Sequence, residues 1–370
     1  MRAMAAFLLG LVVLLPFLTT PRLKGEEGRR GLVGREMASR GEWVVPTVAG
    51  ETYLKKPPGG GWSRAAMVAA LADYRGAEIW DVAALRLPSV LAAALLCGLV
   101  VLLARGSVDQ RTAGIAGVML AGTVLLLEKG ARGEVDAEFA LGIGCVLVAL
   151  PRILSAERAP IGAMLAASVG LAWGLLTKGL VATLFIGGAL LPLLVLGRCN
   201  AAGVARTGAV LLGGSVPYLV WWRLTGQALG GFDALGAATV SETVNQLPSW
   251  DKEALVRALS LPLVLLVATL PWSPFLVRAW RERKSLPRPV RDLGWCVVGP
   301  LILLSVAAVG ATRYLLPLAA PAAVLAAAAA STCDYRRRAG GLGRYVIRVL
   351  QVGLVLGASV GLTGLAIRMI

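Results

Sequence analysis

The hydrophilic segment 21–81 contains two charged clusters, Gly25-Glu26-Glu27-Gly28-Arg29 and Tyr53-Leu54-Lys55-Lys56-Pro57-Pro58. The segment carries eight acidic and ten basic side chains, whereas the sequence on both sides of it is strongly apolar. We therefore expect it to lie at a membrane surface, between one hydrophobic span and a long series of others, and to carry the chemistry.

The composition is that of an integral membrane protein. The 370 residues are 57% hydrophobic and 16% charged, with a mean hydropathy of +0.74, whereas soluble domains are about 45–50% apolar. We predict an all-α polytopic membrane protein in which residues 1–370 form a single transmembrane domain. The net charge is +16, but the basic residues do not gather in a soluble region with interleaved aromatics, so nucleic-acid binding is not expected.

Apolar runs that approach a membrane helix of about 20 residues predict eleven spans. The first, residues 4–18, is interpreted as an uncleaved signal anchor, with a cleaved signal peptide as the alternative. The others are predicted at 82–104, 112–128, 137–151, 160–176, 180–197, 207–222, 256–277, 294–310, 315–331 and 346–367. Segment 21–81 is then the first external loop, with surface helices at 27–38 and 62–74, and residues 223–255 form a second large external loop.

The distribution of charge between alternate loops predicts the orientation. With a cytoplasmic N-terminus, the inner segments hold 18 of the 37 Lys and Arg residues and five of the 21 acids, while the outer segments hold 19 bases and 16 acids. The net charge is thus +13 inside and +3 outside, as the positive-inside rule requires. Acidic residues do little to set topology, so their concentration outside indicates a functional role there.

The residue types narrow the chemistry. The chain has no histidine, so general acid–base catalysis must come from carboxylates. Its five cysteines are scattered without a CxxC pair. Prolines extend the backbone at Lys55-Lys56-Pro57-Pro58. This motif is either a rigid basic turn on anionic lipid headgroups or a clamp for a lipid-linked phosphate.

The order and spacing of the loop motifs resemble those of a known superfamily. The motifs are Glu26-Glu27-Gly28-Arg29, Arg35-Glu36-Met37, Gly41-Glu42-Trp43 and Tyr53-Leu54-Lys55-Lys56-Pro57-Pro58. They resemble the first external loop of the GT-C glycosyltransferases that use polyprenyl-phosphate sugars, a group related to the aminoarabinose transferases of lipid A and to protein O-mannosyltransferases. The resemblance continues, in the same order, at Val135-Asp136, Leu176-Thr177-Lys178-Gly179, Leu270-Pro271-Trp272-Ser273 and Arg313-Tyr314-Leu315-Leu316-Pro317.

This resemblance implies a GT-C fold and a membrane glycosyltransferase. Such an enzyme would sit in a bacterial inner membrane and transfer a sugar from a polyprenyl-phosphate donor to a glycan, lipid or protein acceptor on the outer side, with inversion. Two alternatives are a transporter or flippase of lipid-linked sugars, and an inactive GT-C relative that serves as an assembly partner. Membrane lipids are expected to surround the protein in each case.

The resemblance also assigns roles to individual residues. The catalytic carboxylates are expected to be Glu26 and Asp136, although Asp136 is alternatively a helix-cap acid. The cations expected to bind the donor phosphate are Lys56 first, then Lys55, Lys178, Arg313 and Arg29. The remaining substrate-loop residues are expected to be Glu27, Tyr53, Glu242 and Tyr314.

Two departures from the family pattern qualify these roles. Relatives often carry an acid before the Lys-Pro and a Glu-His pair in the later loop, which together can hold a divalent metal. Here the positions read Lys55 and Glu242-Thr243, and an ammonium group cannot ligate a metal. A divalent metal is therefore disfavoured and no other cofactor is expected. The second departure is Gly59-Gly60-Gly61, which predicts either a mobile lid or a flexible connector.

Overall fold

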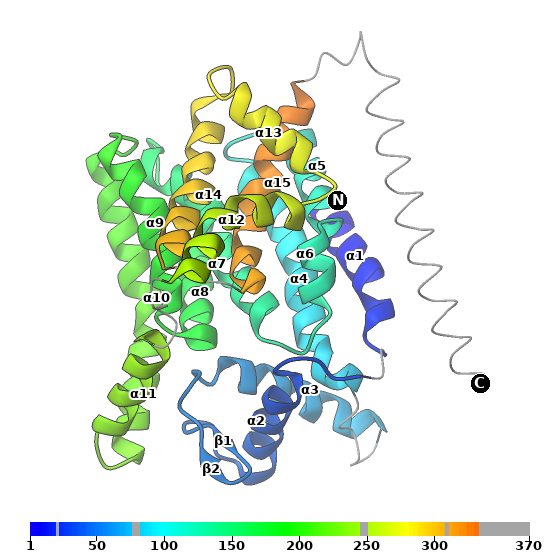
Figure 1. Ribbon diagram of the computed structural model, residues 1–370, viewed down its shortest axis with the longest axis vertical. Helices are drawn as coiled ribbons and strands as arrows, with labels where there is room; N and C mark the ends of the chain where they lie inside the picture. The colour runs from blue at the N-terminus through cyan, green and yellow to red at the C-terminus, as the bar shows by residue number, and fades with distance from the viewer. Residues whose placement is uncertain (20–21, 76–81, 245–250, 308–310, 333–370) are drawn as a thin grey trace, which may run out of the picture.

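The computed structural model describes residues 1–19, 22–75, 82–244, 251–307 and 311–332, with side chains at all of these except 71–75 and 242–244. The described chain is almost entirely helical (Figure 1). The helices of the apolar body are α1 (Arg2–Leu14), α4 (Val82–Ala104), α5 (Gln110–Ala121), α6 (Val124–Gly130), α7 (Asp136–Ser155), α8 (Ile161–Lys178), α9 (Val181–Val195), α10 (Ala201–Ala228), α12 (Lys252–Ala268), α13 (Ser273–Arg281), α14 (Arg288–Val306) and α15 (Leu316–Ser331). Short 3-10 turns, η1 (Leu15–Phe17) and η2 (Thr312–Leu315), follow α1 and precede α15.

Each of the first ten predicted spans coincides with a helix or a bent helix pair, but the count of eleven is not confirmed. Five described helices are long and apolar enough to cross a membrane, or up to seven if each bent pair is one span. The bends are 57° between α5 and α6 and 116° between α12 and α13. Pro271 contributes to the second break, because proline has no backbone N–H to donate. The eleventh predicted span, 346–367, lies outside the described residues.

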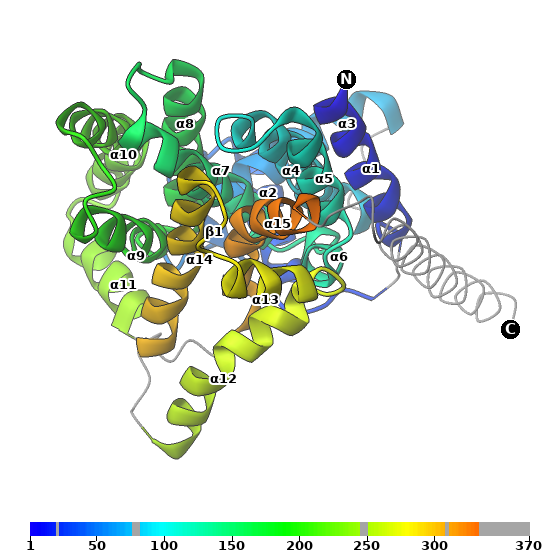
Figure 2. The ribbon, with the colours of Figure 1, turned by 90° about the horizontal axis from the view of Figure 1, so that it is seen from above.

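Helices α7 and α15 form the centre of the body. Figure 2 shows α15 surrounded by other helices, and almost all of its residues are buried. Its alanine run, residues 326–330, lets neighbouring helices approach closely, as small residues do in membrane proteins. Close approach also joins α7 to α8, because Gly142 and Gly170 face each other with no room for a Cβ atom.

Loops that alternate along the sequence meet at opposite ends of the helix body. The first external loop lies below one end (Figure 1) and is joined to α10 by a hydrogen bond of 2.8 Å from the Trp221 indole N–H to the Val44 carbonyl. Hydrogen bonds at the other end pair Thr112 with Ser331, Arg206 with Ala156 and Arg288 with Gly197. The loops thus separate into the two groups that the hydropathy pattern predicted.

The first external loop contains the two predicted surface helices, α2 (Glu27–Arg40) and α3 (Gly59–Arg75), together with a hairpin that the all-helical prediction missed. The hairpin strands are β1 (Thr47–Val48) and β2 (Glu51–Thr52). Ala49 and Gly50 between them have φ values of 55° and 84°, and two successive positive φ angles suit a tight hairpin turn. The second large loop contains α11 (Asp233–Val244).

Two buried ion pairs fasten this loop to the helices. Glu27 of α2 pairs with Arg86 of α4 at 2.7 Å, and Arg64 of α3 pairs with Glu138 of α7 at 2.9 Å. All four side chains are buried. A buried charge is costly unless it is paired and hydrogen-bonded, so these pairs hold α2 and α3 in one position on the helix body.

The glycines at 59–61 form the first turn of α3 and are buried. A Cβ at Gly59 would lie 2.7 Å from the carbonyl oxygen of Leu176, and a Cβ at Gly61 would lie 2.6 Å from the sulfur of Met37. Both distances are too short for real contacts. The Leu176 backbone leaves no room for a side chain at Gly59, whereas the Met37 side chain would have to shift for one at Gly61. The interpretations as a lid and as a flexible connector are both wrong.

Candidate active site

A polar cavity of about 230 Å³ opens between the first external loop and the ends of α7, α8 and η2. Nine of the predicted site residues line it: Glu26, Arg29, Tyr53, Lys55, Lys56, Asp136, Lys178, Arg313 and Tyr314. They come from segments up to nearly 300 residues apart in the sequence. Arg30, Glu134 and Val135 complete the lining.

The inner wall of the cavity is a buried ion pair between Asp136 and Lys178. Asp136 is the first residue of α7 and Lys178 is the last residue of α8, so the two helix ends bring them together. The Lys178 ammonium also lies 4.6 Å from the centre of the Tyr314 ring and 4.9 Å from that of Phe139, within range of cation–π attraction. The N-cap residue of α7 is Val135, and the ion pair of Asp136 is formed with the lysine.

The opposite wall is the start of α2. Glu26 is the N-cap residue of this helix, and its carboxylate contacts Arg29 at 2.7 Å and Arg30 at 3.6 Å. Arg30 also donates a hydrogen bond of 2.8 Å to the Tyr53 hydroxyl. Glu26 therefore enters the cavity with its charge already matched by two guanidinium groups.

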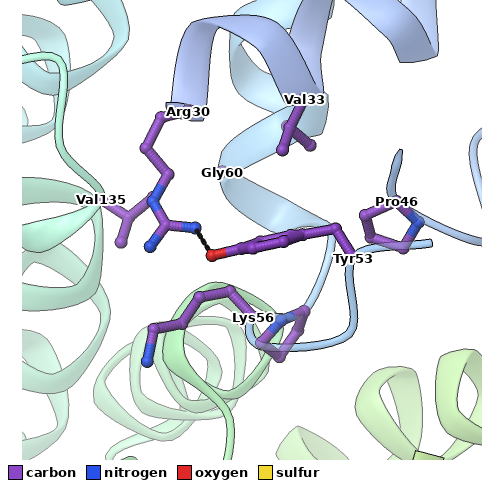
Figure 3. A pocket seen from close by; sticks show the side chains of 9 residues that line it. Arg30, Val33, Pro46, Tyr53, Lys56, Gly60 and Val135 are labelled. Carbon is purple, nitrogen blue, oxygen red and sulfur yellow. Dashed lines mark hydrogen bonds between the residues drawn. The ribbon is translucent and has the colours of Figure 1, made fainter. Parts of the chain in front are cut away.

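A small pocket adjoins this wall (Figure 3). Arg30, Tyr53, Lys56, Gly60 and Val135 are among its lining residues. Figure 3 shows that the Tyr53 hydroxyl and the Lys56 side chain both extend toward the side where Val135 lies. Since Arg30, Tyr53 and Lys56 line the main cavity as well, they join the two spaces.

The lining carries an excess of positive charge. Its six basic side chains are Arg29, Arg30, Lys55, Lys56, Lys178 and Arg313, and its three acidic ones are Glu26, Glu134 and Asp136. Charge-assisted hydrogen bonds from such cations are the usual way for proteins to hold phosphate. The cavity therefore has the charge to bind a phosphate group beside carboxylates that can handle a proton.

Two predicted residues are not brought into the cavity. Glu27 is fully buried, and its carboxylate accepts hydrogen bonds from Arg86, from Gly133 N–H and from Lys24 N–H. Burial alone would raise the pKa of Glu27, but the hydrogen bonds from Arg86, Gly133 and Lys24 outweigh it and hold the pKa below its usual range. Glu242 lies near the end of α11, and its side chain is outside the described part of the chain.

Glu134 is the cavity carboxylate that the sequence analysis passed over. Its Oε1 accepts a hydrogen bond of 3.2 Å from the backbone N–H of Glu26. Burial raises the pKa of the Glu134 carboxyl above its usual range, and its hydrogen bond with Asp136 and the negative charge of Asp136 raise it further. Glu134 lies two residues before Asp136, and this close spacing of two acids was the signal in the sequence that could have identified it as a site residue.

Within the described ranges, no three His, Cys, Asp or Glu side chains are grouped so that they could hold a metal ion. Lys55, which stands where metal-holding relatives carry an acid, lines the cavity with an ammonium group that cannot be a metal ligand. An ammonium group has no lone pair to offer, so this lining does not fit the metal that the resemblance implies.

Comparisons with known proteins identify relatives of this chain. A family model described as dolichyl-phosphate-mannose-protein mannosyltransferase matches residues 55–222. The undecaprenyl phosphate-alpha-4-amino-4-deoxy-L-arabinose arabinosyl transferase of Yersinia enterocolitica is 27% identical over 349 residues, covering 90% of this chain and 59% of the relative. The corresponding protein of Serratia proteamaculans is 28% identical over 375 residues, covering 96% and 62%.

Solved structures share the fold. ArnT from Cupriavidus metallidurans, bound to undecaprenyl phosphate, superposes with a TM-score of 0.75 at 22% identity, over 94% of this chain and 63% of that one. The chain has the GT-C fold and resembles the lipid A aminoarabinose transferases. The more distant Archaeoglobus fulgidus oligosaccharyltransferase shares this fold with a TM-score of 0.60 at 13% identity, over 96% of this chain and 51% of its own.

The resemblance predicted from the motifs is thus confirmed. The chain spans about three fifths of the length of the curated relatives it matches. The region that the family model matches includes six of the residues that line the cavity, which are Lys55, Lys56, Glu134, Val135, Asp136 and Lys178.

Proposed function

We propose that this protein transfers a sugar from a polyprenyl-phosphate donor to an acceptor at the outer face of a bacterial inner membrane, with inversion. The observation that carries the proposal is the cavity, where six basic and three acidic side chains meet at the ends of the apolar helices. A lipid donor enters such a site from the bilayer with its phosphate at the level of these cations. The acceptor is a glycan, a lipid or a protein.

The cations hold the donor phosphate and stabilise the charge that grows on it as the sugar leaves. Lys56 and Arg313 line the same cavity as Lys178, and Asp136 fixes the ammonium of Lys178 from one side. Because these groups are held in place before the reaction, they need little reorganisation as charge develops. Arg29 and Lys55 supply further positive charge at the edge of the site.

The carboxylates handle the acceptor and the sugar. Inversion in one displacement requires the acceptor atom to attack the anomeric carbon while the phosphate leaves on the opposite side, with a carboxylate near the acceptor's proton. We assign Glu26 to orient the acceptor group, because it faces the cavity from the loop side. Asp136, on the helix side, orients the sugar and Lys178.

The orientation follows from the loop charges. The segments predicted to be internal carry a net charge of +13, and hydrogen bonds among the described ones lie at the end of the body away from the cavity. The positive-inside rule assigns that end to the cytoplasm. The cavity then faces outward and the N-terminus lies inside.

One structural observation favours an enzyme over a transporter. In the described membrane helices, charged side chains lie toward the helix ends, as Arg86 does in α4, Lys178 in α8 and Arg288 in α14. Transporters and proton relays place ionisable groups near the middle of the bilayer. The charges of this protein instead converge at the membrane boundary, where a phosphate group would lie.

We further propose that transfer does not depend on a divalent metal. Lys55 lines the cavity at the position where metal-holding relatives carry an acid, and its ammonium supplies positive charge there in place of an ion. No step of the proposed reaction requires a metal.

The experiment uses purified protein in detergent or nanodiscs with undecaprenyl-phosphate sugars and measures transfer, or slow hydrolysis, by mass spectrometry. We expect turnover in the native protein and a loss of about 10²-fold or more in Glu26→Gln. The matched control is Glu253→Gln, whose side chain is 85% exposed on α12 and is expected to retain turnover. Donor binding without turnover in the native protein would instead identify an inactive GT-C relative.

A further inference from the structure

Glu134 is held in the cavity by contacts on two sides. The residue is only 4% exposed, yet it lines the cavity between the first loop and α7. One carboxylate oxygen accepts the N–H of Glu26 at 3.2 Å, and Asp136, two residues further along the chain at the start of α7, acts on the carboxyl group with its negative charge. Its position is therefore determined by both walls of the site.

The neighbouring carboxylate, Glu26, has different partners. Its side chain is 34% exposed and forms ion pairs with Arg29 at 2.7 Å and Arg30 at 3.6 Å. A proton placed on Glu26 would remove the negative charge that both guanidinium groups contact. Among the described residues Glu134 forms no such ion pair, and its carboxylate accepts its hydrogen bond from a backbone amide.

We propose that Glu134 is the catalytic residue that accepts the acceptor's proton during transfer, while Glu26 orients the acceptor. This inference rests on the proposed sugar transfer. The acceptor oxygen or nitrogen forms a bond to the anomeric carbon, and the bond from that carbon to the phosphate oxygen breaks with its electron pair leaving on the polyprenyl phosphate. The acceptor's proton moves to a carboxylate oxygen of Glu134.

Asp136 makes this transfer favourable. Once protonated, Glu134 can donate a hydrogen bond to the Asp136 carboxylate, and Lys178 holds that carboxylate in its ionised form through their buried ion pair. A hydrogen bond with an ionised partner is roughly twice as strong as one between neutral groups. The new acid is thus stabilised where it forms, and the proton stays inside the site.

The electrostatic surroundings support the same role. The charged groups that face Glu134 are Asp136 on α7, Lys129 on α6 and Arg313 on η2. The backbone amide of Glu26 faces it as well. Burial and then Asp136 raise its pKa, while the Glu26 amide and Lys129 act in the opposite direction. A base with a pKa nearer the working pH is a more effective proton acceptor. Since the base must be ionised, activity should rise as the pH increases through this raised pKa.

The test compares Glu134→Gln, Glu134→Asp and the exposed control Glu253→Gln in the transfer assay. Glutamine keeps an oxygen for the Glu26 amide, so the loop should stay in place. We expect Glu134→Gln to lose about 10²–10⁴-fold in kcat and to lose the acidic limb of the pH profile, with binding of undecaprenyl phosphate within a factor of three of native. Glu134→Asp should recover part of the rate and the pH dependence.

Three results would overturn the inference. The first is a Glu134→Gln rate and pH profile within threefold of native while Glu26→Gln is inactive, which leaves sugar transfer standing and makes Glu26 the base. The second is a loss of donor binding equal to the loss of rate, which makes Glu134 structural. The third is a native protein that turns over no polyprenyl-phosphate sugar, which removes the proposed function and this inference together.

Discussion

Replacing Glu27 by glutamine is expected to destabilise the fold strongly, although the side chain lies outside the cavity. Each carboxylate oxygen accepts two hydrogen bonds: Oε1 from Arg86 Nε at 2.7 Å and Gly133 N at 2.6 Å, and Oε2 from Arg86 Nη2 at 2.9 Å and Lys24 N at 2.7 Å. Glutamine keeps one acceptor oxygen and turns an NH₂ group toward two donors. Losing two hydrogen bonds to a charged group costs about 3–6 kcal/mol, consistent with about 3–5 kcal/mol for breaking a buried ion pair.

The assay is thermal unfolding of the detergent-purified protein, followed by size-exclusion chromatography after heating. Glu26→Gln is the matched control on the adjacent residue, because its partly exposed pair with Arg29 is worth about 1 kcal/mol or less. The double variant Glu27→Leu/Arg86→Met should recover most of the loss, since replacing both partners removes the uncompensated charge. The precision of the assay is about 1 °C. A Glu27→Gln protein whose melting temperature lies within about 1 °C of native would refute the structural role assigned to this pair.

Three further outcomes are expected. Because hydrogen bonds lower the folded-state pKa of Glu27, its stabilisation is complete above the unfolded pKa near 4.5 and is lost as the pH falls through the lower folded value; a melting temperature with the same acid dependence in Glu27→Gln would contradict this. EDTA should leave transfer unchanged while Lys55→Glu reduces it about tenfold or more, because it reverses a cavity charge; loss of activity in EDTA with rescue by zinc would refute the metal-free proposal. Gly59→Ala should lower the melting temperature because the new Cβ would lie 2.7 Å from a backbone oxygen of Leu176, whereas Gly162→Ala, with nothing within 4 Å, should not; equal melting curves would show that α3 shifts freely.

The helices of the first loop were predictable because their composition and amphipathic pattern are local properties. The hairpin at 47–52 was missed, since Ala49 at positive φ is uncommon for a residue with a side chain. The glycines at 59–61 were misread for a related reason. Glycine permits both mobility and close contact, and only the neighbours Leu176 and Met37 show that close contact applies here.

Some roles of the site residues could likewise be predicted from local sequence, and others depend on tertiary contacts. Glu26 and Glu27 are adjacent in sequence and chemically identical, so motif order alone gave both a role in the site, Glu26 as a catalytic carboxylate and Glu27 as a substrate-loop residue. In the structure the first residue of α2 turns its side chain inward to Arg86, while the N-cap residue before it faces the cavity. Glu134 was not selected because its value lies in contacts with Glu26 and Asp136, which the sequence does not display.

Hydropathy, loop charge and motif spacing were therefore sufficient for the helical membrane architecture, for the separation of loops into two groups and for most of the cavity's residues. These properties depend on the bilayer's thickness and on short segments of chain, which can be read locally. The pairing of Asp136 with Lys178, the burial of Glu27 and the placement of Glu134 were decided only by tertiary packing. A carboxylate's role depends on which charges and donors surround it, and those partners come from distant parts of the chain.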